Sequence, residues 1–284
     1  MLDALVIGAG PAGLTAAIYL GRFRRAALVI DGAASRARWI PQSHNLLGFP
    51  HGISGQDLLT QLRAHAQQYG ARIRQATIAN ITRTDDGFAI PLTDEVIHAR
   101  YVILATGIRD HLPDLPGAED AVRRGVLRIC PICDAYEAIG KRIAVLSDGP
   151  RGEREADFLR TYSDSVTVLH IGPAHEAQRR LDLQKRGMEV IQIGLQHVTI
   201  EPDGLRIKQP SGETRGFDVC YTALGCSPHH ELATSLGATC DENDQLLVSA
   251  HCETSIPGLY AVGDVVRGLN QVVPAQGRHA CAGA

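Results

Sequence analysis

Two cysteines separated by two residues stand in segment 128–137, RICPICDAYE, and Asp134 follows the second cysteine directly. Thiol–disulfide exchange passes through a mixed disulfide that a neighbouring thiol resolves, so the spacing of Cys130 and Cys133 suits a redox disulfide. A carboxylate beside such a pair can transfer the proton that the thiols gain or lose. The same spacing also supplies half of a zinc site, which is the competing interpretation.

A zinc site would need two further ligands, usually a second cysteine pair or a histidine pair. His170 and His175 have no partners at the spacing of a zinc finger. The remaining cysteines are scattered among apolar or turn residues: Cys220, Cys226, Cys240, Cys252 and Cys281. An odd total of 7 cysteines also argues against a disulfide framework. We therefore predict a redox disulfide at Cys130–Cys133, incidental thiols elsewhere and no metal.

The elements that would position this pair begin with an N-terminal strand–helix–strand unit. A short apolar strand ends in glycines, an alanine- and leucine-rich helix follows, and a second strand ends at Asp31. In the pattern Gly8-x-Gly10-x-x-Gly13, the glycines permit a tight turn, a close approach to pyrophosphate and packing of helix on strand. Asp31 lies 18 residues after Gly13, near the spacing of an acid that binds a ribose hydroxyl. The unit predicts dinucleotide binding.

The rest of the chain continues the α/β pattern. Apolar residues at helical spacing predict a helix over 54–69, with Ser54 or Asp57 capping its start. Strand-like runs lie near 77–84, 87–92 and 101–105. Proline-rich HLPDLPG is a linker, after which 141–172 repeats the strand–turn–helix–strand pattern, and a last strand at 259–262 ends in a Gly-Asp turn. We predict an α/β fold with two Rossmann-like, doubly wound, three-layer nucleotide-binding units.

Composition limits the classes of partner. The 284 residues are enough for two domains, and 44% hydrophobic with 21% charged residues is typical of a globular protein. A net charge of −3 without a long basic run argues against nucleic acid and anionic membranes. No apolar run approaches the ~20 residues of a membrane span. No export signal precedes the first strand, so we expect a cytoplasmic protein.

Five motifs occur in a fixed order: GAGPAG at 8–13, SHNLLGFPHGISG at 43–55, ILATG at 103–107, the Cys-x-x-Cys-Asp at 130–134, and TSIPGLYAVGD at 254–264. In this combination the chain resembles the low-molecular-weight thioredoxin reductases, which are FAD-containing disulfide oxidoreductases, over essentially its whole length. The resemblance implies a split FAD domain, 1–112 and 228–284. It also implies that a second domain, 113–227, is inserted into the FAD domain. This inserted domain is similar to an NADPH-binding domain and carries the CxxC.

The resemblance also assigns roles. Cys133 would be the thiol next to the flavin, Cys130 the thiol that exchanges with a partner, and Asp134 the general acid–base group. The implied FAD residues are Gly8, Gly10 and Gly13 at the pyrophosphate, Asp31 at the adenosine ribose, Asn45 on the flavin side, Thr106 and Gly107 lining the site, Asp264 after Gly263 at the ribityl or phosphate portion, and Gln271 at the isoalloxazine. A homodimer is implied as well.

The second nucleotide site departs from this resemblance. The family carries GxGxxA for the NADPH pyrophosphate, whereas 147–152 is SDGPRG, with Ser147 replacing the first glycine and Asp148 at the turn. Where the family has HRR, whose arginines pair with the 2′-phosphate, 170–172 is HIG. The arginines that would have to substitute are Arg151, Arg179 and Arg180. We therefore expect FAD as the cofactor and regard NADP(H) as doubtful.

Three other residues each have two interpretations. His44 and His279 are either bases near the flavin, because histidine titrates close to neutral pH, or surface or packed side chains. Trp39, the only tryptophan, either packs against the FAD loop or fills a core.

The leading interpretation is an FAD enzyme that moves two electrons between flavin and the Cys130–Cys133 pair, and then to or from a thioredoxin-like protein or a small dithiol. Without NADPH, the family offers a ferredoxin-linked reductase or a dithiol oxidase that passes electrons to oxygen. One alternative is a conventional NADPH-dependent thioredoxin reductase. Another, of a different class, is a non-enzymatic flavin-binding redox sensor.

Overall fold

The computed structural model describes residues 1–173, 182–209 and 211–272 and divides into two compact units. Unit 1 comprises Met1–Arg38, Leu46–Arg109 and Ser227–Ala284. Unit 2 comprises Trp39–Asn45 and Asp110–Cys226. Each unit is built on its own mainly parallel sheet, and the predicted α/β fold class is therefore confirmed.

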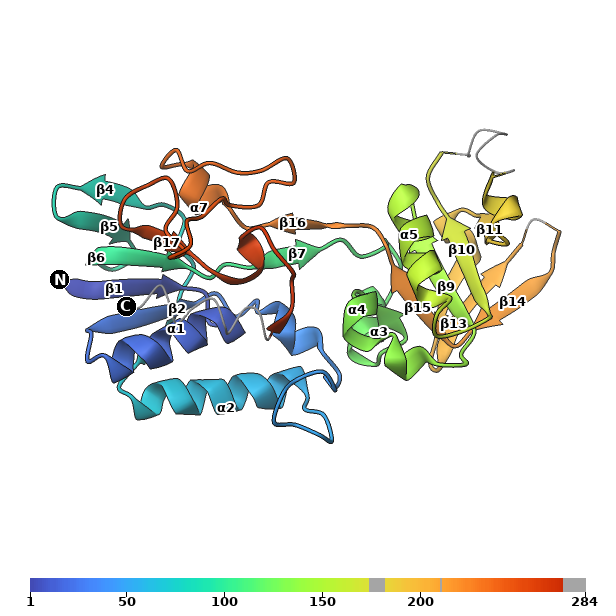
Figure 1. The fold of residues 1–284 in the computed structure, drawn as a ribbon, viewed down its shortest axis with the longest axis horizontal. Helices are drawn as coiled ribbons and strands as arrows, with labels where there is room; N and C mark the ends of the chain where they lie inside the picture. Colours follow the sequence, from blue (N-terminus) through green and yellow to red (C-terminus); the bar gives the residue numbers. More distant parts are fainter. Residues whose placement is uncertain (174–181, 210, 273–284) are drawn as a thin grey trace. The chain divides into compact units, whose positions relative to one another are not determined.

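The sheet of unit 1 has the strand order β3-β2-β1-β6-β5-β4, with β17 also paired to β6 (Figure 1). Its strands are β1 (Leu2–Ile7), β2 (Ala27–Asp31), β3 (Arg72–Gln75), β4 (Thr82–Thr84), β5 (Gly87–Pro91), β6 (Val96–Leu104) and β17 (Leu259–Ala261). The pairs β1–β2, β1–β6, β2–β3 and β6–β17 are parallel, and the hairpin β4–β5 joins β6 antiparallel. Ile7, Ile30, Leu104 and Ala261 form one row across the sheet, so the residues that follow them share its carboxyl edge.

Two helices lie on one face of this sheet, α1 (Pro11–Arg22) and α2 (Gly55–Gln68) (Figure 1). Pro11 occupies the first helical position of α1, where its missing N–H and fixed φ cost nothing. Ser54 caps α2, because its Oγ accepts the backbone N–H of Asp57 at 3.0 Å. Unit 1 also contains a short helix α7 (Glu231–Thr234) and the 3-10 turn η4 (Gly263–Val265).

The main sheet of unit 2 is parallel throughout, in the order β11-β10-β9-β15-β8. Its strands are β8 (Leu127–Arg128), β9 (Ile143–Ser147), β10 (Val166–His170), β11 (Glu189–Gln192) and β15 (Val219–Thr222). Every residue of β9 and β15 is buried, as expected of central strands in a parallel sheet. A second, antiparallel sheet contains β12 (Val198–Glu201), β13 (Gly204–Lys208) and β14 (Thr214–Phe217).

The helical elements of unit 2 that lie wholly within the described residues include α4 (Pro131–Asp134), which carries the cysteine pair. They are α3 (Ala118–Arg123), α4 itself, α5 (Pro150–Leu159) and the 3-10 turns η2 (Tyr136–Ala138) and η3 (Leu195–His197). Helix α5 connects β9 to β10 and packs against both strands as well as against α4 (Figure 1). Trp39 is partly buried and packs against the hydrophobic core of unit 2, as one of its two interpretations expects.

The chain leaves unit 1 along β7 (Ile108–Asp110) and returns along β16 (Cys226–Pro228), and these two strands pair with each other. One predicted strand is shorter than expected, because only Thr82–Thr84 of the run 77–84 joins a sheet. Ile78 and Ile81 in that run are packed into the core of unit 1 instead. No helix in the described part of the chain is long and apolar enough to cross a membrane.

Candidate active site

The glycine-rich turn after β1 forms a narrow cradle at the start of α1. Gly8 has φ +111°, and a Cβ there would collide with the backbone oxygen of Ala105. A Cβ on Gly13 would collide with the backbone oxygen of Gly8, so α1 approaches the turn closely. Gly10 is the N-cap of α1 and offers no side chain to the N–H groups of the first turn. This is the geometry that binds a pyrophosphate at a helix N-terminus.

Asp31 ends β2 on the same edge of the sheet and is only 8% exposed. Its Oδ1 accepts the backbone N–H of Ala33 at 2.8 Å, and its Oδ2 pairs with the guanidinium of Arg63 from α2. These two contacts therefore hold the carboxylate at the position where an adenosine ribose is expected. Its contact with that ribose stays a prediction.

Thr106 and Gly107 follow β6, the strand paired with β1. The Thr106 hydroxyl donates to the carbonyl oxygen of His229 at 2.6 Å, and the Gly107 carbonyl accepts the N–H of His229 at 3.0 Å. These bonds fix the loop after β6 at the carboxyl edge of the sheet, where ligands of open α/β sheets bind.

Gly263 and Asp264 follow β17 on the same edge. Gly263 has φ +79°, and a Cβ there would lie 2.8 Å from the Cβ of Ala12 in α1, so this turn also borders the cradle. Asp264 Oδ2 lies 3.7 Å from Nη1 of Arg36. The amide Nε2 of Gln271 donates to the carbonyl oxygen of Asn270 at 3.1 Å.

These features of unit 1 fit FAD. The glycine cradle and the uncapped start of α1 suit its pyrophosphate, and Asp31 suits a ribose hydroxyl. The individual contacts of Thr106, Gly107, Asp264 and Gln271 with the cofactor stay predictions.

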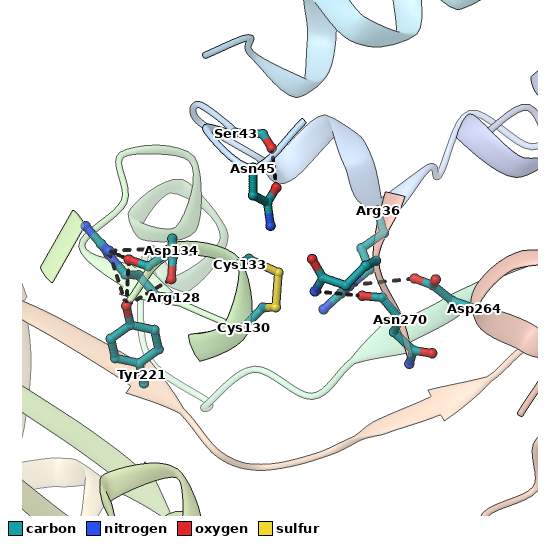
Figure 2. The surroundings of a disulfide bond; sticks show 11 residues. Arg36, Ser43, Asn45, Arg128, Cys130, Cys133, Asp134, Tyr221, Asp264 and Asn270 are labelled. Atoms are coloured by element: carbon teal, nitrogen blue, oxygen red, sulfur yellow. Dashed lines mark hydrogen bonds and ion pairs between the residues drawn. A yellow bond between two sulfur atoms is a disulfide. The ribbon is translucent and has the colours of Figure 1, made fainter. Parts of the chain in front are cut away.

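In unit 2, Cys130 and Cys133 form a disulfide with a Cα–Cα distance of 5.3 Å (Figure 2). Cys130 is the N-cap of α4 and Cys133 lies within that helix, so one helical turn sets their separation. The N–H of Cys133 donates to the carbonyl oxygen of Cys130 at 3.0 Å and closes the turn. Among the described residues, no group of His, Cys, Asp or Glu is arranged to hold a metal ion.

Asp134 ends α4 and is held by two residues of the sheet beneath it (Figure 2). The Tyr221 hydroxyl donates to Asp134 Oδ1 at 2.9 Å, and Arg128 Nη1 lies 3.7 Å from Asp134 Oδ2. Burial raises the pKa of Asp134 to about 6, although the charge of Arg128 and the hydrogen bond from Tyr221 oppose that rise. A carboxyl that titrates near neutral pH suits general acid–base chemistry beside a thiol pair.

Asn45 belongs to unit 2, together with the rest of Trp39–Asn45. Its Oδ1 accepts the hydroxyl of Ser43 at 3.0 Å, and the residue itself is exposed (Figure 2). Its expected contact with the flavin stays a prediction. His44 is exposed. His279 lies outside the described residues, as do His175, Arg179, Arg180 and Cys281.

The second nucleotide-type turn lies between β9 and α5. Ser147 Oγ accepts the backbone N–H of Gly149 at 3.2 Å and of Gly152 at 3.1 Å, and it donates to the Gly149 carbonyl at 2.8 Å. The hydroxyl therefore occupies backbone donors at the start of α5.

A sequence profile described as pyridine nucleotide-disulphide oxidoreductase matches residues 2–279. The chain belongs to this family. Among its relatives, the bifunctional thioredoxin reductase/thioredoxin of Mycobacterium leprae is 29% identical over 97% of this chain and 63% of the relative. The thioredoxin reductase of Mycolicibacterium smegmatis is 30% identical over 93% of this chain and 88% of the relative. A solved thioredoxin reductase from Streptococcus pyogenes superposes with a TM-score of 0.88, at 26% identity, over 100% of this chain and 96% of the other.

This pyridine nucleotide-disulphide oxidoreductase is thus an FAD-dependent disulfide oxidoreductase of the thioredoxin reductase type, with two Rossmann-like domains, as the resemblance implied. It spans less than two thirds of the M. leprae relative, whose name states two activities.

Sequence reasoning did not identify four residues around these sites. Arg36 pairs with Asp264, and Arg63 pairs with Asp31. Asp134 is held by Arg128 and Tyr221. Arg128 stands two residues before Cys130, which is a weak local hint. Tyr221 is 87 residues from Asp134, and only strand pairing brings the two together.

Proposed function

We propose that the chain exchanges two electrons between bound FAD and the Cys130–Cys133 disulfide, and between that disulfide and an external dithiol, without NADPH as electron donor. The observation that carries the proposal is the Ser147 hydroxyl, which accepts the N–H groups of Gly149 and Gly152. Dinucleotide pyrophosphates bind such donors at a helix N-terminus. Here a side chain of the protein already occupies them.

The charge around the same turn supports this part of the proposal. Asp148 lies in the turn itself, and Glu153 is buried in the first turn of α5. Carboxylates at a helix N-terminus are favourable for the helix, but they repel a phosphate brought to the same place.

Packing after β10 supports it as well. The family resemblance expects an arginine at position 172, yet a Cβ on Gly172 would collide with the backbone oxygen of Asp148. His170 is buried, and its Nε2 donates to the Pro173 carbonyl at 2.8 Å. A guanidinium for the 2′-phosphate therefore does not fit at Gly172 without a shift of the backbone.

The chemistry assigned to the cysteines is a two-step exchange. A thiolate of the external dithiol attacks the sulfur of Cys130, the Cys130–Cys133 bond breaks, and Cys133 leaves as a thiolate. The second thiolate of the dithiol then attacks the mixed disulfide, which releases an oxidised substrate and leaves both cysteines reduced. Asp134 accepts or returns the proton that accompanies each thiol. Bound FAD would supply the two-electron acceptor that lets the reduced Cys130–Cys133 pair close its disulfide again. A reductase runs the same steps in reverse.

The relatives named thioredoxin reductase favour a thioredoxin-type protein as the external dithiol, with small dithiols or disulfides as the alternative. On the other side of the flavin we propose ferredoxin as donor or oxygen as acceptor. The resemblance further implies a homodimer, which light scattering on the purified protein would check. The cytoplasmic location expected from the sequence would be checked by cell fractionation.

The test uses the purified protein with its bound flavin under anaerobic conditions. NADPH, NADH and then dithiothreitol are added while the flavin absorbance is followed, with Cys130→Ser and Cys133→Ser as controls. We expect no bleaching by either pyridine nucleotide, and bleaching by dithiothreitol only when both cysteines are present. Readmitted oxygen or chemically reduced ferredoxin then separates the oxidase from the ferredoxin-linked reductase.

Two results would reject the proposal. Rapid bleaching by NADPH would make the protein a conventional NADPH-dependent thioredoxin reductase. A flavin that dithionite reduces, but that neither dithiothreitol nor a reduced thioredoxin reduces, would favour a non-enzymatic redox sensor.

A further inference from the structure

Arg128 and Tyr221 are partners in the register of β8 and β15, two neighbouring parallel strands. Residues paired in this way project their side chains on the same side of a sheet. Nη1 of Arg128 donates to the Tyr221 hydroxyl at 3.2 Å, and the guanidinium lies over the Tyr221 ring at 5.8 Å from its centroid. The two side chains therefore form one support that is built on regular strands.

This support contacts Asp134 through both its backbone and its side chain (Figure 2). Arg128 Nη1 donates to the Asp134 carbonyl oxygen at 2.7 Å, which fixes the C-terminal end of α4. The Tyr221 hydroxyl donates to Oδ1 at 2.9 Å, and Arg128 pairs with Oδ2 at 3.7 Å. The carboxylate thus has a separate partner for each oxygen, which limits its rotation.

Stability does not account for this arrangement. The Arg128 side chain is 9% exposed and Tyr221 is fully buried, so both polar groups lose contact with water on folding. A guanidinium and a hydroxyl that are taken out of water in this way are seldom more stabilising than apolar side chains of similar volume. What distinguishes this pair is its target, the residue directly after Cys133.

We propose that Arg128 and Tyr221 are positioning residues, which hold the Asp134 carboxylate in one orientation and favour its ionised form during thiol–disulfide exchange. The inference rests on the proposed function, in which Asp134 handles the proton.

The electrostatic surroundings give the direction of the effect. Burial raises the pKa of Asp134 to about 6, while Arg128 and Tyr221 lower it. Burial and the charge of Asp134 raise the pKa of Tyr221 well above its usual value, so its hydroxyl stays a donor. The other charged side chains on the neighbouring elements are Glu137, Lys141, and on α5 Arg151, Glu153, Arg154, Glu155 and Asp157. None of these seven is changed in the variants below.

The test titrates Asp134 directly in the holoprotein. Aspartate labelled with 13C at the carboxyl carbon is followed by NMR against pH, and Asp134→Asn assigns the signal. Tyr221→Phe removes one hydrogen bond to a charged group, which should move the titration of Asp134 upward by roughly one pH unit. Tyr162→Phe is the matched control, because Tyr162 packs against the same hydrophobic cluster as Tyr221.

Two variants of Arg128 complete the test. Arg128→Met should also move the titration upward, and Arg128→Lys should return it toward the wild-type value, because the charge is restored without the planar fork. The pH profile of flavin reduction by dithiothreitol should move in the same direction in each variant. Tyr221→Phe keeps the test decisive if Arg128→Met does not fold.

An Asp134 titration that is the same in wild type, Tyr221→Phe and Arg128→Met would overturn the inference, whatever the flavin does. If the Asp134 titration shifts in the variants, but dithiothreitol does not reduce the flavin of the wild-type protein, the proposed function is rejected instead. A shift that Tyr162→Phe reproduces would also overturn the inference, since the effect would then belong to the core as a whole.

Discussion

The hydroxyl oxygen of Ser147 accepts the backbone N–H of Gly152 at 3.1 Å and thereby caps α5 from outside the helix. Gly149, the N-cap itself, has no side chain with which to do so. Gly152 in turn packs directly on Ser147, since a Cβ at Gly152 would collide with the Cβ of Ser147. The turn after β9 is thus held by a hydrogen bond and by close packing between Ser147 and Gly152.

Ser147→Ala should lower the free energy of unfolding by about 1 kcal/mol, because helix caps contribute about that amount. Urea unfolding followed by circular dichroism measures the change. Ser211→Ala, at an exposed loop position of the same unit, is the control and should leave the midpoint unchanged. Equal midpoints for Ser147→Ala and wild type would mean that water replaces the cap at no cost.

Gly13→Ala should release FAD although alanine favours helices by about 1 kcal/mol. The added methyl would collide with the backbone oxygen of Gly8 and push α1 away from the cradle. The ratio of flavin to protein absorbance after gel filtration measures the loss. Gly32→Ala is the matched control, because a Cβ at Gly32 meets nothing within 4 Å. Full flavin retention by Gly13→Ala would contradict the assignment of this turn to the cofactor.

Cys133→Ser should trap a thioredoxin-type partner at Cys130, whereas Cys130→Ser should not. With a thioredoxin whose first active-site cysteine carries a thionitrobenzoate disulfide, the free thiolate of Cys130 expels thionitrobenzoate and forms a mixed disulfide. We expect this reaction to be at least about tenfold faster in Cys133→Ser than in Cys130→Ser, because Cys130 is the thiol assigned to exchange with the partner. The adduct persists because no second thiol of the pair remains to resolve it. Non-reducing gel electrophoresis separates the adduct. Faster trapping by Cys130→Ser would reverse the two roles.

Asp134→Asn should slow the exchange between flavin and disulfide by at least about 100-fold without loosening FAD, since the amide cannot carry the proton. Anaerobic stopped-flow absorbance measures the rate. Asp164→Asn changes an exposed carboxylate of the same unit and should leave the rate intact. An unchanged rate in Asp134→Asn would remove this residue from the proton path.

Glu155→Gln should stabilise the protein at alkaline pH. Burial raises the pKa of Glu155 to about 7, and its Oε2 has no hydrogen-bond partner in the described part of the chain. The unfolded chain releases this proton at lower pH than the folded one, so the wild type loses stability as pH rises from about 4.5 through about 7. The variant should gain about 1–3 kcal/mol near pH 8 and little near pH 4.5.

The Tm of Glu155→Gln and wild type at the two pH values measures this difference. Glu213→Gln, an exposed position in the same unit, should show no such dependence. A Tm difference of equal size at both pH values would point to packing as its cause.

Local patterns in the sequence were sufficient to predict the glycine cradle, the strand–helix alternation and the cysteine pair, because each depends on residues that are close together in the sequence. The edge strand β3 was missed, since its residues Arg72–Gln75 include a single apolar side chain. The support of Asp134 was missed because Arg128 and Tyr221 are 93 residues apart. Their meeting depends on which strand lies beside β8, and periodicity within one segment does not encode that choice.

The assignment of Trp39–Asn45 shows the same limit. Nothing in that segment indicates which core will take up Trp39, and its packing in unit 2 follows from the tertiary fold.

The pairing of β7 with β16 has a consequence for protein engineering. The N–H of His111 donates to the carbonyl oxygen of Gly225 at 2.9 Å, so the two cut sites for excising the inserted segment are adjacent. A short loop could join the flanking ends of unit 1 after such a deletion. The excised piece, however, would lack Trp39, which packs against its hydrophobic core. A stand-alone version of unit 2 would therefore need a replacement for that indole, supplied by a tethered peptide of residues 39–45 or by larger apolar side chains around the gap.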